Sequence, residues 1–207
     1  VFHRYAHQPW LNVAPGMTMG FYGTQYERTQ TWWELSGAWH AYLARCQFLL
    51  RQGVAVADIL YLTPEGAPHV FRPPPSALAG SRTLPDRRGY NFDGCDPQTL
   101  IERVSVRAGK LVLPDGASYQ MLVLPQTPTM TPQLLAKVKQ LLAAGALVVG
   151  PRPVKSPSLT DHPRCDAEVQ RLADAVWGKR ENAATSGPRK VGRGTLVATE
   201  LKSNSQR

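Results

Sequence analysis

The sequence lacks the features that would place it at once in a membrane, secreted or metal-binding class. It has no run of about 18 apolar residues, so we expect no membrane-spanning helix. Its opening has no basic stretch before an apolar core, so we expect no signal peptide. Cys46, Cys95 and Cys165 are too widely spaced for a disulfide framework or a CxxC site. A periplasmic, extracellular or cytoplasmic location is compatible with this composition.

Several catalytic and nucleotide-binding motifs are also missing. There is no GxGxxG, no GxxxxGK[ST], no HExxH and no GxSxG. The loop at 124–129 follows a predicted strand, which is where open α/β sheets bind ligands. Its two prolines remove N–H donors that a phosphate would need, so a structural turn is favoured over a nucleotide site. His3 and His7 are likewise better explained by hydrogen bonding to a substrate or by structural contacts than by a zinc pair.

The net charge of +9 does not indicate a nucleic-acid-binding protein, because the charge is concentrated at one end. Residues 179–207 hold seven Lys/Arg and two Glu, which accounts for more than half of the excess. No basic stripe is interleaved with aromatic residues, and no helix-turn-helix or zinc-finger spacing appears. We therefore predict that 179–207 is a basic, disordered tail, with neither nucleic acid nor membrane as a partner.

An amphipathic helix is predicted near the start of the chain. Thr31 can cap it, Glu34 follows in capping-box position, and Gly53 ends it. A catalytic role is the less favoured alternative for Glu34. Apolar residues recur at helical spacing and predict a buried stripe. The stripe consists of Trp32, Leu35, Trp39, Leu43, Cys46 and Leu50.

Residues 54–178 have the alternating pattern of a doubly wound α/β domain. Buried strands are predicted at 57–62, 121–124 and 146–149, and a hairpin at 104–113. Helices are predicted from Asp96-Pro97 to Arg103, from Thr131-Pro132 to Gly145, and over 166–176. The connection 63–92 is rich in proline and glycine and is long for a compact domain.

The density of aromatic and polar side chains is highest before residue 40. Four of the five tryptophans lie between residues 10 and 39, close to histidine and glutamine side chains. Aromatic rings cover the apolar C–H faces of a sugar, while amides and imidazoles bond its hydroxyl groups. Trp32 and Trp39 fit the packed stripe of the helix better than a ligand site. The predicted sugar-binding residues are His3, His7, Gln8, Trp10, Gln30 and Trp33.

Long stretches of the chain resemble one enzyme family. FHRYAHQPW, PGMTMGFYGTQYERTQTWWE and AWHAYLARCQFLLRQGVAVADILYL are similar to the bacterial α-L-rhamnosidases of glycoside hydrolase family 106. GKLVLPDGASYQMLVLP and MTPQLLAKVKQLLAAGALVVGPRPVKSPSL resemble the region that follows the catalytic barrel in these proteins. The resemblance covers about 2–178, and the pattern of the family is lost past Gly194.

The resemblance implies an internal fragment of a larger hydrolase. Residues 1–53 would be the last strand end and helix of a TIM-type barrel, and 54–178 a flavodoxin-like or glutamine-amidotransferase-like accessory domain. The family inverts at the anomeric carbon with a glutamate acid and a glutamate base, near a bound calcium ion. Both glutamates and the calcium ligands would lie outside this chain, which would be inactive alone and would contact the rest of its own polypeptide. Its six candidate residues would form the rim of the site for a rhamnose-containing glycan or glycoside.

Two other classes of function stay open at this point. The first is a non-catalytic α/β module that binds carbohydrate or acts as a scaffold. The second is a nucleic-acid-binding protein that uses the basic tail, which predicts a steep salt dependence of DNA affinity. The half-barrel segment is also expected to expose tryptophan and leucine side chains in the isolated chain. The natural substrate, the linkage and the oligomeric state do not follow from the sequence.

Overall fold

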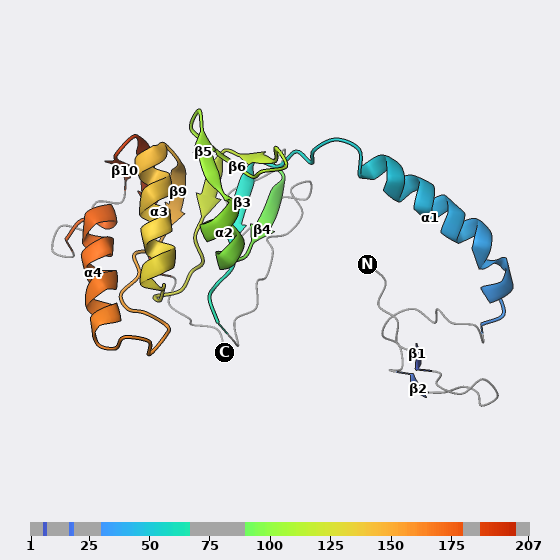
Figure 1. The fold of residues 1–207 in the computed structure, drawn as a ribbon, viewed down its shortest axis with the longest axis horizontal. Coiled ribbons are helices and arrows are strands. Elements are labelled where there is room, and N and C mark those ends of the chain that lie inside the picture. The colour runs from blue at the N-terminus through green and yellow to red at the C-terminus, as the bar shows by residue number, and fades with distance from the viewer. Residues whose placement is uncertain (1–5, 8–16, 19–29, 67–89, 180–186, 202–207) are drawn as a thin grey trace. The chain divides into compact units, whose positions relative to one another are not determined.

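The computed structural model describes residues 6–7, 17–18, 30–66, 90–179 and 187–201. The chain divides into two compact units, Val1–Gly53 and Val54–Arg207, and each is described by itself (Figure 1). Within the described ranges, no helix has the length and apolar character needed to cross a membrane.

The first unit contains two short strands and one long helix. Strand β1 (Ala6–His7) pairs antiparallel with β2 (Met17–Thr18). A 3₁₀ turn, η1 (Trp33–Leu35), leads directly into helix α1 (Ser36–Leu50). Arg51 is the C-terminal cap of α1, so Gly53, with φ +81°, lies beyond the cap instead of closing the helix. The predicted helix is real, but it is shorter at both ends.

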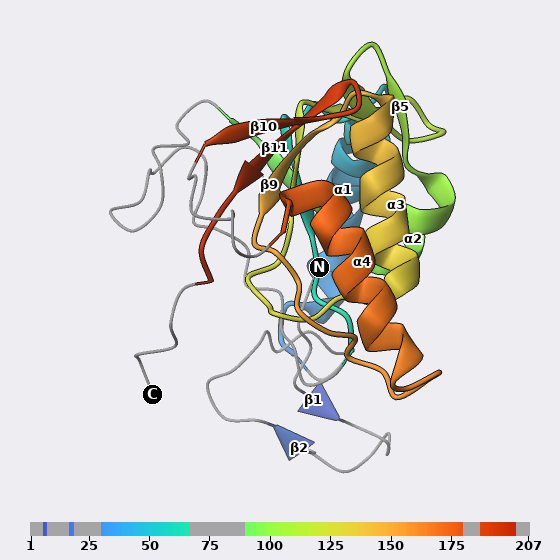
Figure 2. The same ribbon diagram turned by 90° about the vertical axis from the view of Figure 1, so that its left-hand side faces the viewer.

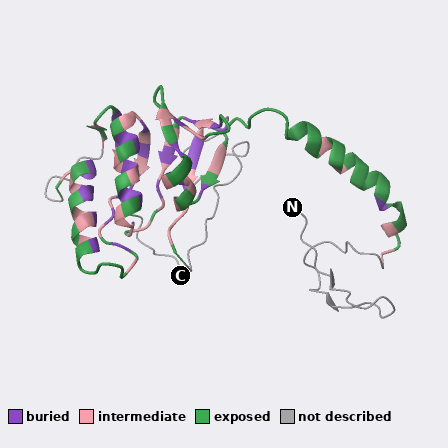
Figure 3. Ribbon diagram, in the orientation of Figure 1, coloured by how far each residue is buried: buried purple, intermediate pink, exposed green. Residues whose placement is uncertain are grey.

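Most residues of helix α1 are exposed (Figure 3), and several of them are large and apolar. Trp39 is 45% exposed and Leu50 85%, although both belong to the predicted buried stripe. The stripe is not buried in the described part of this unit, where its other members Trp32, Leu43 and Cys46 are only half-buried. The expected exposure of tryptophan and leucine is confirmed, because Leu35, Phe48 and Leu49 are exposed as well.

The second unit is built on a six-stranded sheet. Its strands are β3 (Ile59–Leu62), β4 (Phe92–Cys95), β8 (Met121–Val123), β9 (Leu147–Gly150), β10 (Pro188–Val191) and β11 (Gly194–Ala198). The spatial order is β10-β11-β9-β8-β3-β4, and only the edge strand β10 is antiparallel to its neighbour. Counted along the chain, the five parallel strands have the order 2-1-3-4-5 of flavodoxin-type sheets. The predicted α/β class with a mostly parallel sheet is confirmed.

Three helices lie together on one side of this sheet (Figure 2). They are α2 (Pro97–Arg103), α3 (Pro132–Ala144) and α4 (Arg164–Trp177). Asp96 caps α2 by accepting a hydrogen bond from the backbone N–H of Thr99 at 2.9 Å. Thr131 caps α3 in the same way, and Gly145 ends it in the left-handed region at φ +118°. The cap residues predicted for α2 and α3 are therefore confirmed.

A small antiparallel sheet stands between α2 and β8 along the chain. It consists of β5 (Ser105–Arg107), β6 (Lys110–Val112) and β7 (Ser118–Tyr119), in that order. Ala108 and Gly109, which connect β5 and β6, both have positive φ, as a type I′ hairpin turn requires. The hairpin is confirmed, whereas the short third strand was not predicted.

The predicted disordered tail is wrong for residues 188–198. These residues form β10 and β11, and β11 pairs in parallel with β9 in the interior of the sheet. Leu196 is completely buried. The basic residues at 189, 190 and 193 dominated the sequence-based interpretation, whereas the apolar run at 194–198 determines the structure. Arg189 and Lys190 lie on the edge strand, where charged side chains discourage pairing with another chain.

Candidate functional site

The structure places two of the six predicted sugar-binding side chains. Gln30 and Trp33 are described and partly exposed. His7 lies in β1, where only its backbone is described, opposite Met17. His3, Gln8 and Trp10 lie outside the described residues. Whether the six residues converge on one ligand therefore stays a prediction.

A tight turn joins Gln30 to the start of α1. The backbone N–H of Trp33 donates to the carbonyl of Gln30 at 3.1 Å, and that of Leu35 donates to the carbonyl of Trp32 at 3.0 Å. The cap positions of η1 and α1 are Trp32 and Leu35, and neither makes a side-chain cap bond. The predicted capping box of Thr31 and Glu34 is wrong, because the 3₁₀ turn moves the helix start to Ser36. Glu34 is exposed in this turn.

Two aromatic pairs form the described surface of this segment. Trp33 meets His40 edge to face, with ring centroids 6.3 Å apart and an interplanar angle of 78°. Trp39 stacks on Tyr42 at 5.9 Å and 24°. Both pairs offer ring area of the kind that covers the C–H face of a sugar. Sequence reasoning missed His40 and Tyr42, although their spacings of seven and three residues from their partners place each pair on one helix face.

The carboxyl edge of the parallel sheet is the second place to look for a ligand, because doubly wound sheets bind ligands there. Its switch point lies between β3 and β8, and the helix that follows β8 is α3. Glu65, which follows β3, accepts hydrogen bonds from the backbone N–H of Thr131 at 2.7 Å and from its hydroxyl at 2.6 Å. The carboxylate of Glu65 thus sits at the N-terminus of α3, where an anionic ligand would bind. This arrangement disfavours a phosphate site and agrees with the structural turn predicted at 124–129.

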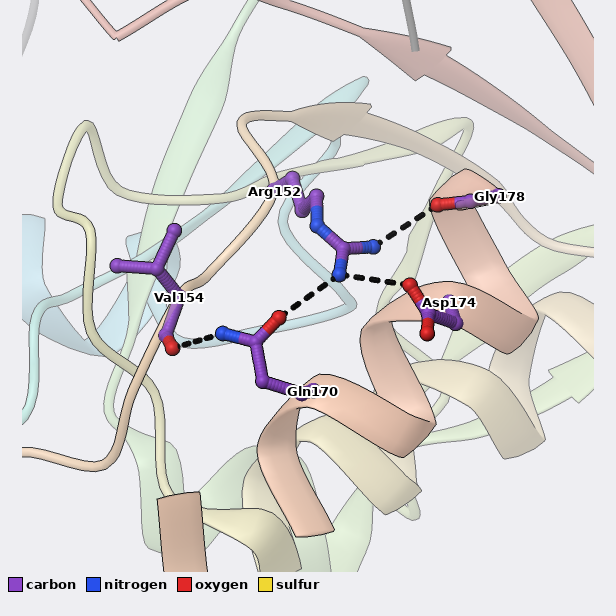
Figure 4. Close-up of polar contacts among 5 residues, drawn as sticks. All are labelled: Arg152, Val154, Gln170, Asp174 and Gly178. Carbon is purple, nitrogen blue, oxygen red and sulfur yellow. Dashed lines mark hydrogen bonds and ion pairs between the residues drawn. The ribbon is translucent and has the colours of Figure 1, made fainter. Parts of the chain in front are cut away.

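A second polar cluster follows β9 and is centred on Arg152 (Figure 4). The guanidinium donates from one nitrogen to Asp174 at 2.8 Å and to Gln170 at 3.0 Å, and from the other to the carbonyl of Gly178 at 3.0 Å. Gln170 in turn donates to the backbone carbonyl of Val154. The Arg152 side chain is only 12% exposed.

This cluster fastens the segment after β9 to the C-terminal half of α4. A cation near the end of a helix is favourable, because the helix dipole places partial negative charge there. Three of the hydrogen bonds are charge-assisted and hold the Arg152 side chain in one geometry. The Nε atom of Arg152 is buried and has no hydrogen-bond partner among the residues described. The arrangement is that of a structural clamp.

The donor groups of the described residues do not form a metal site. Across the described ranges, no group of three or more His, Cys, Asp or Glu residues is close enough to hold a metal ion. Cys95 is buried, and burial raises the pKa of its thiol to about 11, so the metal-binding thiolate is disfavoured. Calcium takes oxygen ligands, and the described residues lack a carboxylate cluster for the calcium site that the family resemblance implies.

Comparison with known protein families decides which group the chain belongs to. The model of glycoside hydrolase family 106, described as alpha-L-rhamnosidase, matches residues 1–205. The chain belongs to this family. Because the match runs to residue 205, the expectation that the family pattern is lost past Gly194 is wrong. Residues 194–198 form strand β11 and lie within the region that the family model matches.

Two relatives show how long related proteins are. A rhamnosidase from Novosphingobium sp. PP1Y has a similar structure, with a TM-score of 0.64 and 28% identity over 88% of this chain. A protein of Formosa agariphila, provisionally named beta-glucuronidase, is 40% identical over 181 residues, or 86% of this chain. The matched region is only 16% of the first protein and 14% of the second. The chain therefore spans about one sixth of the length of these relatives.

Proposed function

We propose that this chain is an internal part of a glycoside hydrolase that cleaves terminal α-L-rhamnosyl linkages. The family match over residues 1–205 carries the proposal. The similarity to a solved rhamnosidase, at 28% identity, supports it. Because the relatives are about six times longer, the activity would belong to a larger polypeptide. In that polypeptide this chain supplies the end of the catalytic barrel and the α/β domain that follows.

The first unit would provide one wall of the sugar site. In this proposal His3, His7, Gln8, Trp10, Gln30 and Trp33 form its rim, with rings against the sugar face and polar groups on its hydroxyls. Two observations support this role. The ring of Trp33 is partly exposed, and a backbone hydrogen bond from Trp33 to Gln30 holds the two residues in one turn.

The bond-breaking groups would lie elsewhere in the polypeptide. An inverting glycosidase needs a general acid and a general base about 6.5–9.5 Å apart on opposite sides of the scissile bond. In the described part of the first unit Glu34 is the sole carboxylate, so this part cannot supply such a pair. We infer that two glutamates outside this chain carry out acid and base catalysis. Calcium would bind outside the described residues, and no step is assigned to it.

The α/β unit would act as a scaffold in this enzyme. The carboxylate of Glu65 occupies the N-terminus of α3. The guanidinium of Arg152 makes three hydrogen bonds to α4 and to its C-terminal cap, Gly178. These two observations also favour the alternative function, a non-catalytic α/β module.

The reaction is tested on the whole protein with two aryl glycosides. We expect release of the aryl group from an α-L-rhamnoside and little from a β-D-glucuronide, the substrate class suggested by the name of the Formosa relative. Proton NMR at early times should show β-rhamnose as the first product, because inversion changes the anomer. First-formed α-rhamnose would contradict the inverting mechanism, and preferential glucuronide cleavage would contradict the substrate.

The rim is tested by Trp33→Ala, with Phe48→Ala, at an exposed position of α1, as the control. Loss of one aromatic contact of about 0.5–1.5 kcal/mol should weaken rhamnoside binding up to about tenfold. Calorimetric titration of the whole protein with rhamnose measures this loss, and Trp10→Ala should behave like Trp33→Ala. If neither variant differs from the control, the first unit is not part of the rim.

The isolated chain of 207 residues provides a separate test of the fragment proposal. We expect no turnover of the aryl rhamnoside, because both catalytic carboxylates would be missing. Robust turnover by this chain would show that it contains a complete catalytic site.

A further inference from the structure

The central sheet has one face that its three described helices cover. Leu60, Leu122, Val148 and Leu196 lie in one cross-strand row, since each is paired in register with the next. All four are buried, and they belong to one core cluster with residues of α3 and α4. We call this side the helix face.

Side chains alternate along a strand, so the neighbours of that row point to the opposite side, which we call the second face. In the described parallel strands this face is almost entirely apolar, whereas the edge strand β10 adds Pro188 and Lys190 to it. Ile59 is buried, although it does not belong to the core cluster of the helix face. On the parallel strands Gly94 is exposed, and the remaining members are partly exposed: Tyr61, Phe92, Met121, Val123, Leu147, Val149, Thr195 and Val197.

An apolar second face is what a parallel sheet has when both of its sides are covered. Tyr61 and Phe92 pack edge to face on this side, with centroids 5.7 Å apart and an interplanar angle of 88°. Both rings also have interaction partners beyond this pair. The helices α2, α3 and α4 cannot provide the cover, because they lie on the helix face (Figure 2).

The strand order indicates which part of the chain crosses the second face. The connections through α3 and α4 step from β8 to β9 to β11, in one direction across the sheet. The connection from β3 to β4 steps in the opposite direction between parallel strands. Crossovers between parallel strands are right-handed in about 98% of cases. A right-handed connection in the opposite direction must pass over the opposite face.

We propose that the second face, where β3, β4 and β8 form it, is the docking surface for residues 67–89 of the same chain. The connection from 63 to 91 is long enough, since a crossover needs about a dozen residues. It also carries apolar side chains suited to such a surface, at Val70, Phe71, Leu78 and Leu84. This inference does not depend on the proposed glycosidase activity.

A photo-crosslink in the full chain tests the docking directly. Phe71 is replaced by its photoreactive analogue p-benzoylphenylalanine, a conservative change in shape. We expect crosslinks to Met121, Tyr61 or Phe92, located by mass spectrometry. The same analogue at Leu159, an exposed loop residue, is the control and should not react with these three residues. Crosslinks from position 71 to α3 or α4, or between two copies of the chain, would overturn the proposal.

Methionine oxidation gives an independent readout. In the Phe71→Ser, Leu78→Ser double variant, peroxide should oxidise Met121 several-fold faster than in the wild type. Met130, buried in the core of the helix face, is the internal reference and should not change. An unchanged rate at Met121 would overturn the proposal. A variant that fails to fold is recognised by an equal rise at Met130, and the crosslink at position 71 then decides.

Discussion

The placement of β11 inside the sheet makes a strong prediction about Leu196. Its side chain is 0% exposed and lies beside Val148 in the row that faces the helices. Leu196→Ala removes three buried carbon groups, which cost about 2.4 kcal/mol at about 0.8 kcal/mol each. The cavity left behind adds to this loss, and buried Leu→Ala changes range over about 2–5 kcal/mol. We expect the free energy of unfolding to fall within that range.

Urea unfolding of the full chain, followed by far-ultraviolet circular dichroism, measures the change. With a slope of about 2 kcal/mol per molar urea, the midpoint should fall by about 1–2.5 M. Leu159→Ala is the matched control, because Leu159 is 84% exposed in the same unit. A surface change of this kind should alter the free energy of unfolding by less than about 0.5 kcal/mol. If Leu196→Ala were as mild as Leu159→Ala, β11 would not be part of the sheet.

Three further variants test single positions of the α/β unit. Gly194→Ala should lower the melting temperature, because a Cβ there would lie 2.4 Å from two backbone carbonyl oxygens, an overpacking cost of about 1–3 kcal/mol. Asp96→Ala should cost about 0.5–2 kcal/mol at pH 7. Hydrogen bonds at the helix start lower the pKa of this carboxyl. Its contribution to the free energy of unfolding is therefore present above about pH 4 and is lost as the pH falls further. Thermal unfolding at a series of pH values measures this loss. Burial and the hydrogen bond to Asp93 raise the pKa of Tyr119 to about 12, so its contribution is complete below about pH 10 and is lost as the pH rises towards 12. In Tyr119→Phe, the free energy of unfolding should no longer show this fall across the alkaline range.

In the α/β unit, the helix ends could be predicted because residues close in sequence determine them. Asp96-Pro97 and Thr131-Pro132 each combine a side-chain cap with a proline whose missing N–H costs nothing at that position. Gly145 takes a positive φ that other residues avoid. Each signal depends on residues within one helical turn, so no tertiary information is needed to interpret it.

The predictions that failed concern features that depend on contacts between residues far apart in the sequence. Strand β11 exists because β9 offers it a parallel edge, and no local pattern separates its short apolar run from a charged tail. The start of α1 depends on a 3₁₀ turn that moved the cap away from Thr31. Glu65 reaches the N-terminus of α3 across 66 residues of sequence, so no motif could have identified it.

The roles of the tryptophans in the first unit also depend on distant contacts. Trp33 was assigned to the sugar and Trp39 to the core, yet in the described unit Trp39 has the more exposed ring. Helices that are apolar all round are normally buried among other elements. Helix α1 has exposed apolar side chains from Trp39 to Leu50, and the chain belongs to a family in which the two relatives are about six times longer. In the larger enzyme that we propose, packing partners would cover one of the two aromatic pairs and leave the other exposed to the sugar. The comparison of Trp33→Ala with Trp39→Ala is therefore informative in either direction. The variant that weakens rhamnose binding without lowering stability identifies the sugar-facing pair, and the variant that lowers stability identifies the packed pair.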